Sequence, residues 1–224
     1  MSSLLSVPTM EAADIIAKFK ANYNGCTRYA DRGVASVGPL LPFRIYFKTE
    51  YEAACDLKFS FKSFFPFPSV GGLKCNKTRS WVTYLGHAES VPTVEHAIGA
   101  LTGVSCLSSY IVPSLLAKLN LNTDWNALKL AGSETYRGRD CFVLAGDNQE
   151  CSDEFWIDCE RFELRRYRSL SRSLLKCIPG GLPVRHSKRF VAVMNSLARS
   201  VEYHDVQMHS SARQGSPNSY ETSA

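Results

Sequence analysis

The feature of this sequence that most restricts its fold is a two-residue alternation of apolar and polar side chains. Residues 57–62 place Leu57, Phe59 and Phe61 at every second position, and residues 43–51 alternate in the same way. Successive side chains of a β-strand point to opposite faces of the sheet, so this pattern indicates antiparallel strands with one face in water. The other segments of strand composition are 28–37, 74–85, 129–136, 141–145, 154–158, 164–170, 185–193 and 200–208. Roughly ten strands without regular strand–helix alternation predict an α+β fold built on one curved antiparallel sheet.

Three helical segments accompany these strands. Apolar residues recur at helical spacing over 12–23, with Thr9 as the expected N-cap and Gly25 at the C-terminal end. Two shorter helices are expected at 94–102 and 110–119. Both are almost wholly apolar and lie between two groups of strands. We therefore expect them to form a lid or plug on one face of the sheet.

Composition and length predict a single folded domain. The chain has 224 residues, of which 45% are hydrophobic and 21% charged, so it holds enough apolar mass for one sizeable core. We expect this domain at 1–208, followed by a disordered tail at 209–224 that is rich in Ser, Gly, Pro and Asn. No run of about 18 apolar residues predicts a transmembrane helix. Residues 1–10 lack the basic region and apolar run of a signal peptide.

Signatures of catalysis, metal binding and nucleic-acid binding are missing from the sequence. The segment 103–107 has the first half of a GxSxG nucleophile motif but lacks its second glycine. The five histidines form neither HxH nor HExxH, and no CxxC pair or phosphate-binding glycine loop occurs. We therefore predict a protein that is not an enzyme, without catalytic residues, a metal site or a cofactor, and without a nucleic-acid partner.

Eight cysteines leave their redox state open. Most are expected to be small buried apolar side chains. One disulfide is the alternative: if 141–146 and 155–159 form a hairpin centred near 148–150, Cys141 lies opposite Cys159.

The positive charge of the chain is concentrated in one segment. Residues 161–189 contain nine Lys or Arg residues and one acidic residue, whereas the rest of the chain is slightly acidic. One interpretation is a solvated strand edge followed by a long loop. The other is a binding surface for anionic lipid headgroups or an acidic protein partner, formed by Arg165, Arg166 and Arg168.

A series of short motifs occurs in a fixed order along the chain. They are Tyr29–Gly33, Ala97–Ser105, Tyr110–Leu116, Gly138–Leu144, Phe155–Asp158 and Leu164–Arg166. In this order they resemble bacterial proteins described as outer-membrane-lipoprotein-sorting-like, which belong to the lipoprotein-carrier (LolA/LolB-like) superfamily. The resemblance spans about residues 10–208.

This resemblance implies a fold, a function and a compartment. The fold is an unclosed, strongly curved antiparallel β-barrel of about eleven strands, with an N-terminal helix and short helices that cover an apolar cavity. Carriers with this fold take up acyl chains, and related periplasmic sensor domains bind lipoproteins. The implied location is therefore periplasmic or otherwise extracytoplasmic, with the cytoplasm as the alternative because the chain shows no signal peptide.

The sequence thus predicts a carrier or sensor that binds lipid acyl chains or lipoproteins in an apolar half-barrel. Its candidate lipid-binding residues, taken from the alternating strand faces and the lid helices, are Phe47, Phe59, Phe61, Trp81, Ile98, Leu101, Val112, Leu115, Leu116 and Trp156. The alternatives are a protein-binding regulatory or scaffold domain that uses the basic segment 161–189 and, more weakly, an enzyme without a recognised motif.

Overall fold

A computed structural model describes residues 10–37, 43–53, 56–64, 68–120, 123–147, 151–171 and 198–210. The strands are β1 (Cys26–Val37), β2 (Phe43–Glu52), β3 (Asp56–Ser63), β4 (Ser69–Cys75), β5 (Ser80–Tyr84), β6 (His87–Val91), β7 (Lys129–Tyr136), β8 (Arg139–Asp147), β9 (Cys151–Asp158), β10 (Leu164–Ser171) and β11 (Ala198–Ser210). The helices are α1 (Ala12–Asn24), α2 (Val94–Thr102) and α3 (Ile111–Leu116), with a 3-10 turn at Trp125–Ala127.

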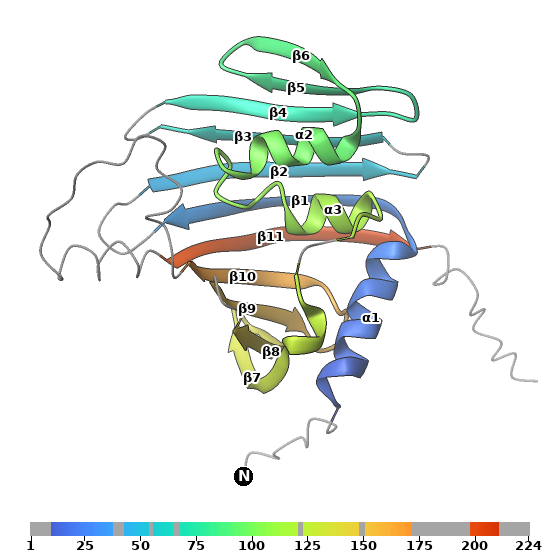
Figure 1. Ribbon diagram of the computed structural model, residues 1–224. Coiled ribbons are helices and arrows are strands. Elements are labelled where there is room, and N and C mark those ends of the chain that lie inside the picture. Colours follow the sequence, from blue (N-terminus) through green and yellow to red (C-terminus); the bar gives the residue numbers. More distant parts are fainter. Residues whose placement is uncertain are drawn as a thin grey trace, which may run out of the picture.

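All eleven strands belong to one antiparallel sheet that curves without closing (Figure 1). Their order is β6-β5-β4-β3-β2-β1-β11-β10-β9-β8-β7, so β6 and β7 are its edges. Two meanders therefore meet where β1 pairs with β11, the last strand of the described chain. This topology confirms the predicted α+β class and the unclosed half-barrel of about eleven strands.

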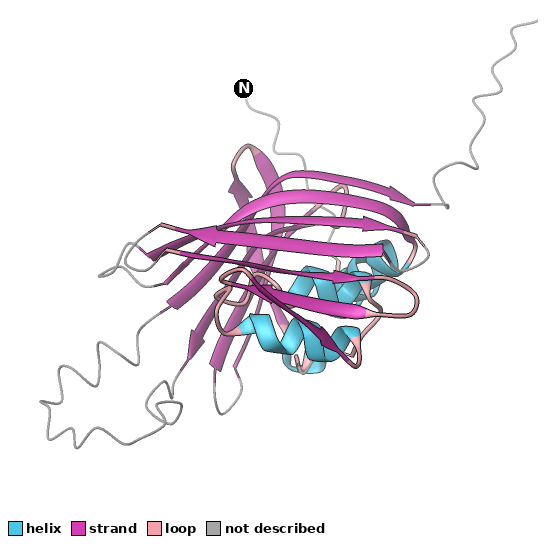
Figure 2. Ribbon diagram, turned by 90° about the horizontal axis from the view of Figure 1, so that it is seen from above, coloured by secondary structure: helices cyan, strands magenta, loops and turns pink. Residues whose placement is uncertain are grey.

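All three helices lie on one side of the sheet, against its concave face (Figure 2). α2 contacts β4, β5 and β6, while α3 contacts β3 and α1. Alternate residues of β3 are buried, as the sequence predicts, and Phe59 and Phe61 pack there against Phe47 of β2 and the apolar sides of the helices. The polar residues between them face solvent on the convex side.

Local sequence explains where α2 begins. Thr93 precedes α2, and its Oγ1 accepts a hydrogen bond from the backbone N–H of His96, which satisfies one of the free N–H groups of the first turn. Glu11 is the N-cap of α1, and the predicted cap Thr9 lies outside the described residues. No helix within the described residues is long and apolar enough to cross a membrane.

Gly33 allows two aromatic rings from the neighbouring strands to pack against each other on the concave face. It lies in β1, opposite Phe47 of β2 and Tyr203 of β11. A Cβ atom at this position would collide with the ring of Phe47 and with the backbone carbonyl of Glu202. The absence of a side chain at Gly33 therefore allows Phe47 and Tyr203 to meet edge to face, with ring centroids 5.5 Å apart.

Two strand predictions need correction or lie beyond what the structure describes. The segment 74–85, predicted as one strand, contains the end of β4, a turn at 76–79 and the whole of β5. The predicted strand at 185–193 lies outside the described residues. At the C-terminal end, β11 runs to Ser210, two residues into the segment predicted as a tail, and 211–224 also lie outside the described residues.

The alternative of a disulfide between Cys141 and Cys159 is wrong. The β8–β9 register pairs Cys141 with Asp158, which leaves Cys159 one residue beyond the expected partner position. Successive strand residues point to opposite faces, so a shift of one residue separates the two side chains. Both thiols are free, as are those of the other described cysteines.

Candidate functional site

A cavity of about 640 Å³ opens at one end of the half-barrel. This is the right-hand end of the sheet in Figure 1. Strands β1, β3 and β5 begin here, and β2 and β4 end here. Helix α2 begins at the same end, and α3 ends there. Its lining residues are Asn24, Gly25, Cys26, Thr27, Tyr51, Ala53, Leu57, Cys75, Asn76, Lys77, Thr78, Arg79, Ser80, Pro92, Thr93, Val94, Leu116, Ala117 and Lys118. The volume lies within the range of roughly 300–1,000 Å³ that small-molecule sites occupy.

The inner wall of this cavity is mainly apolar, with Ser80 as its buried polar residue. Cys26, Leu57, Cys75 and Leu116 are each at most 5% exposed, and they come from four different elements. The half-buried Val94 adds the first turn of α2 to this wall. A wall of this kind favours the alkyl portion of a ligand, since each methylene removed from water contributes about 0.8 kcal/mol.

The two thiols of the wall behave as apolar groups. Burial raises the pKa of Cys26 to about 11 and also raises the pKa of Cys75, so both remain protonated at neutral pH. A protonated buried thiol packs as a small hydrophobe and is neither a nucleophile nor a metal ligand. No cluster of potential metal ligands occurs among the described residues.

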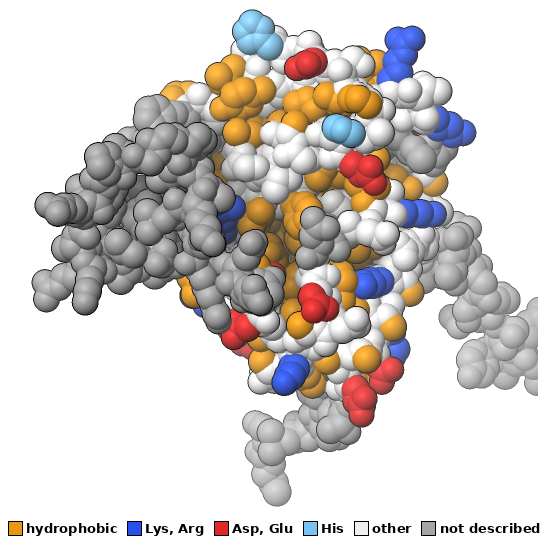
Figure 3. Space-filling model, in the orientation of Figure 1, with side chains coloured by type: hydrophobic (Ala, Val, Ile, Leu, Met, Phe, Trp, Pro, Cys, Tyr) orange, Lys and Arg blue, Asp and Glu red, His pale blue; other side chains and the backbone are white. Residues whose placement is uncertain are grey.

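The rim of the cavity is polar and positively charged. Lys77 and Arg79 come from the β4–β5 turn, and Lys118 follows α3; all three are exposed. None of the lining residues is acidic, and within the described chain none of these three cations forms an ion pair. Lys and Arg side chains lie along the right-hand edge of the face in Figure 3, the end at which the cavity opens.

Eight of the ten predicted lipid-binding residues lie on the concave side. They are Phe47, Phe59 and Phe61 of the sheet, Ile98 and Leu101 of α2, and Val112, Leu115 and Leu116 of α3. All eight are buried and belong to one core, in which the two lid helices cover the aromatic residues of β2 and β3. Leu116 is the member of this set that also lines the cavity.

The two predicted tryptophans lie on the opposite, convex face. Trp81 of β5 lies opposite Lys74 of the neighbouring strand β4, and Lys74 is exposed on the convex face. Trp156 points away from the concave core, and its Nε1–H donates to a carboxylate oxygen of Glu134 at 2.9 Å. The guanidinium of Arg166 stacks on its ring, with 4.7 Å between the guanidinium carbon and the ring centroid. The structure therefore does not bring these tryptophans together with the other eight residues.

The three arginines predicted to bind a partner are each engaged within the chain. Arg165 is largely buried and forms ion pairs with Asp158 at 3.0 Å and Glu163 at 2.9 Å. Arg168 is exposed and forms an ion pair of 3.3 Å with Glu154. Together with Arg166 stacked on the ring of a tryptophan, these contacts account for all three cations. The rest of the basic segment, from residue 172 onward, lies outside the described residues.

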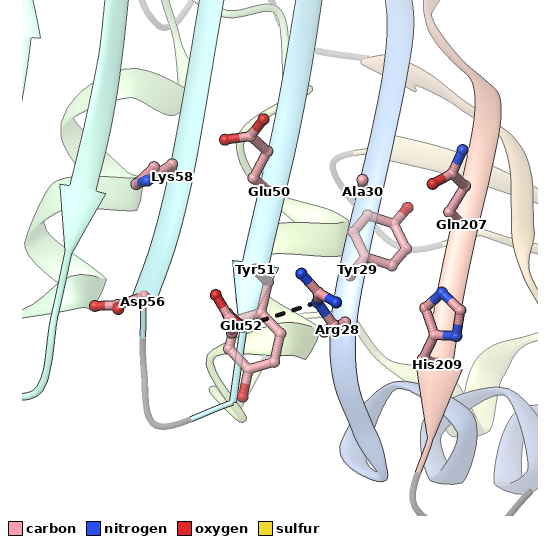
Figure 4. A pocket seen from close by; sticks show the side chains of 10 residues that line it. All are labelled: Arg28, Tyr29, Ala30, Glu50, Tyr51, Glu52, Asp56, Lys58, Gln207 and His209. Atoms are coloured by element: carbon pink, nitrogen blue, oxygen red, sulfur yellow. Dashed lines mark ion pairs between the residues drawn. The ribbon is translucent and has the colours of Figure 1, made fainter.

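A second depression lies on the convex face and has a different character (Figure 4). It has a volume of about 440 Å³ across the β11, β1, β2 and β3 strands. Its charged residues are of both signs: Arg28, Glu50, Glu52, Asp56 and Lys58. Arg28 and Glu52 form an exposed ion pair of 3.8 Å. This solvated surface of mixed charge offers no apolar wall to an alkyl chain.

A buried acid on the concave face was not foreseen from the sequence. Asp31 of β1 is 2% exposed, and its carboxylate accepts hydrogen bonds from the Tyr29 hydroxyl at 2.7 Å and the Thr49 backbone N–H at 2.9 Å. Burial raises the pKa of Asp31 from its ordinary value of 3.8 to about 6, and the two hydrogen bonds partly oppose that rise. The alternation of β1, which places Asp31 in line with Tyr29 and Gly33, is the signal that could have located it.

The cationic rim was also missed from the sequence. The sequence pattern predicts a continuous strand at 74–85, whereas Lys77 and Arg79 lie in the turn between β4 and β5. Asn76 at its start was the available signal, because an Asn side chain readily accepts hydrogen bonds from backbone N–H groups two or three residues ahead.

Comparisons with known proteins give only distant likenesses. No family model matches the chain, and neither does any curated protein. Among solved structures, the chain is similar to the Mycobacterium tuberculosis lipoprotein LppX (9% identity, TM-score 0.48), with 87% of this chain and 94% of that chain covered.

Two further solved structures are similar over most of the chain. A LolA superfamily protein from Nitrosomonas europaea has 9% identity and a TM-score of 0.38, over 90% of this chain and 94% of that chain. A putative outer-membrane lipoprotein-sorting protein domain from Vibrio parahaemolyticus has 9% identity and a TM-score of 0.34, over 92% of this chain and 93% of that chain.

Proposed function

We propose that this protein binds the acyl chain of a lipid or of a lipid-modified protein in the cavity at the end of its half-barrel. The observation that carries the proposal is the cavity itself: about 640 Å³, with a buried apolar wall of Leu57, Leu116 and two protonated thiols. The protein acts by binding rather than by catalysis, as a carrier or a sensor.

The size of the apolar wall is sufficient to hold a ligand. Burying about ten methylenes contributes roughly 8 kcal/mol, from which the loss of ligand freedom is subtracted. The smallest such loss, about 4 kcal/mol, leaves about 4 kcal/mol, which corresponds to a dissociation constant of about 1 mM from burial of the acyl chain alone. The same wall lies directly beside the ends of α2 and α3, so movement of these helices away from the sheet would enlarge the apolar surface that an acyl chain can reach.

The compartment proposed for this function is the periplasm or another extracytoplasmic space. This proposal rests on the sequence resemblance to lipoprotein-sorting proteins. Fractionation of the native host by osmotic shock, with antibody detection of the protein, tests it: recovery only with cytoplasmic markers would contradict it.

The binding proposal is tested by titrating the purified protein with a fluorescent fatty acid and by blocking the cavity. Ala117 lines the cavity at the end of α3, so Ala117→Trp places an indole in the space that the acyl chain needs. Ala100→Trp is the matched control, because Ala100 is an exposed residue of α2 that does not line the cavity.

We expect saturable uptake by the wild-type protein and by Ala100→Trp, with uptake at least about tenfold weaker in Ala117→Trp. Circular dichroism and the thermal midpoint establish that both variants are folded. Absence of uptake by the wild-type protein would refute the proposal. Equal uptake by the two folded variants would show that the fatty acid binds outside this cavity.

A further inference from the structure

We infer that the cavity selects amphiphiles with an anionic head, a carboxylate or a phosphate group, which Lys77, Arg79 and Lys118 hold at the rim while the acyl chain enters along the apolar wall. This inference rests on the proposed function and adds to it the chemical class and the orientation of the ligand. Three features of the described residues carry it: the sign of the rim charge, the fixed backbone beneath it, and the separation of polar from apolar lining.

The first feature is an unbalanced charge at a mouth that opens to an apolar space. The lining contains three cations and no carboxylate, whereas the depression on the convex face contains cations and carboxylates together. The Lys and Arg residues of that outer surface are partly neutralised by neighbours such as Glu50 and Glu52. The rim cations have no such partner among the described residues. An anionic group bound at the mouth of the cavity would therefore supply the missing negative charge.

The second feature is the rigidity of the turn that presents Lys77 and Arg79. The side-chain Oδ1 of Asn76 accepts hydrogen bonds from the backbone N–H groups of Thr78 at 3.0 Å and Arg79 at 2.9 Å, and from the Thr78 hydroxyl at 3.2 Å. The backbone N–H of Asn76 also donates to the Arg79 carbonyl oxygen at 2.9 Å. Four hydrogen bonds within four residues fix the positions from which both cations project.

The backbone that carries Lys118 is fixed in a comparable way. Lys118 has a φ of +58°, in the left-handed region that often ends a helix, and its N–H donates to the Leu115 carbonyl oxygen at 3.1 Å. The next residue, Leu119, donates its N–H to the Ser114 carbonyl oxygen at 2.9 Å. Lys118 is therefore held at the end of α3, and it faces the cavity from the helical side while the turn 76–79 faces it from the sheet.

The third feature is the order of the lining residues from solvent inward. Six of the eight exposed members are polar or charged, including Thr78 and the three rim cations. Four of the five buried members are Leu57, Leu116 and the two thiols, and the fifth is Ser80. An amphiphile bound with its head outward satisfies both zones at once. Arg79 adds specificity, since a guanidinium can donate two parallel hydrogen bonds to a carboxylate or a phosphate.

The test compares ligands that share one acyl chain and differ in the head group. Oleate is compared with monooleoylglycerol, and oleoyl lysophosphatidylglycerol with oleoyl lysophosphatidylcholine, each below its critical micelle concentration. The rim variant is Lys77→Glu, Arg79→Glu and Lys118→Glu combined. The control variant, Lys62→Glu, Lys74→Glu and Lys129→Glu, changes the net charge equally at exposed positions that do not line the cavity. Inorganic phosphate is titrated separately to distinguish a free anion from a lipid head.

We expect the wild-type protein and the control variant to bind each anionic ligand about tenfold more tightly than its partner without net negative charge, with a preference that weakens as salt increases. The rim variant should lose this preference and keep its affinity for monooleoylglycerol. Equal affinity for all four ligands in the wild-type protein would overturn this inference and leave acyl-chain binding intact. Binding of none of them would overturn the proposed function itself. Tight binding of inorganic phosphate alone, without a lipid preference, would assign the rim to a free anion and also overturn the inference.

Discussion

The buried carboxylate of Asp31 predicts a specific dependence of stability on pH. Replacing Asp31 with Asn keeps the size and shape of the side chain and removes its charge. The amide can accept from the Thr49 N–H and donate to the Tyr29 hydroxyl, so both hydrogen-bonding neighbours keep a partner. The substitution therefore separates the effect of the buried charge from the effect of packing.

The magnitude follows from the pKa values. The folded-state pKa of about 6 lies above the ordinary value of 3.8, so the folded protein binds this proton more tightly than the unfolded chain does. The stabilising contribution of the protonated group is complete below pH 3.8 and is lost as pH rises through 6. At about 1.4 kcal/mol for each pKa unit, the loss amounts to about 3 kcal/mol in total and about 2 kcal/mol between pH 4 and pH 8. Asp31→Asn does not undergo this loss.

The assay is urea unfolding of the wild-type protein and of Asp31→Asn at pH 4 and pH 8, with the free energy of unfolding extrapolated to water. Relative to the wild-type protein, the variant should gain about 2 kcal/mol on going from pH 4 to pH 8. Asp56→Asn, an exposed acid of β3, is the control and should show no comparable gain. A difference between the wild-type protein and Asp31→Asn that is the same at both pH values would refute the account of Asp31.

Two further predictions concern the folded chain. Arg165→Ala leaves two buried carboxylates without their cation and should lower the free energy of unfolding by about 3–5 kcal/mol, whereas Arg168→Ala, at an exposed ion pair, should lower it by at most about 1 kcal/mol. Similar losses in the two variants, measured by urea unfolding, would contradict this ranking. Gly33→Ala introduces a Cβ that collides with Phe47 and with backbone, and it should cost about 3 kcal/mol or more; an unchanged thermal midpoint would show that the sheet relaxes around it.

The fold class could be predicted because it depends on local pattern. The alternation of 57–62 and the apolar spacing of 12–23 each indicate which side of the element is buried. These patterns can be recognised without knowing which other elements pack against that side. The ends of elements were predicted less well. The turn at 76–79 is fixed by the Asn76 side chain and lies in the polar run 76–80, across which the sequence analysis expects one continuous strand.

The face of the sheet on which an aromatic residue lies could not be predicted from its apolar character. Trp81 and Trp156 have the composition of cavity residues, yet strand alternation places them on the convex face. There the guanidinium of Arg166 stacks on Trp156 from β10 and Glu134 of β7 accepts its Nε1–H, so the neighbours of Trp156 come from other strands of the sheet. Apolar character alone therefore does not show which face a tryptophan occupies; the alternation of Trp156 with Phe155 and Ile157 was the available signal.

The candidate site was predicted only at the level of its class. An apolar half-barrel with lid helices was expected, and eight of the ten predicted residues lie on its concave side. The cavity, however, lies where the ends of several strands and two helices meet, so its lining comes from segments widely separated in the chain. Leu116 is the single predicted residue within it, because the position of an opening depends on how the helices dock rather than on any one pattern.

The most direct test of the account is to locate a bound acyl chain by photocrosslinking. A fatty acid with a diazirine near the end of its chain is bound to the wild-type protein, irradiated, and mapped by peptide mass spectrometry. The account predicts labels on the segments that hold Leu57, Cys75 and Leu116, with competition by unlabelled oleate. Labels confined to the convex face, or labels that oleate does not reduce, would contradict the claim that this cavity is the binding site.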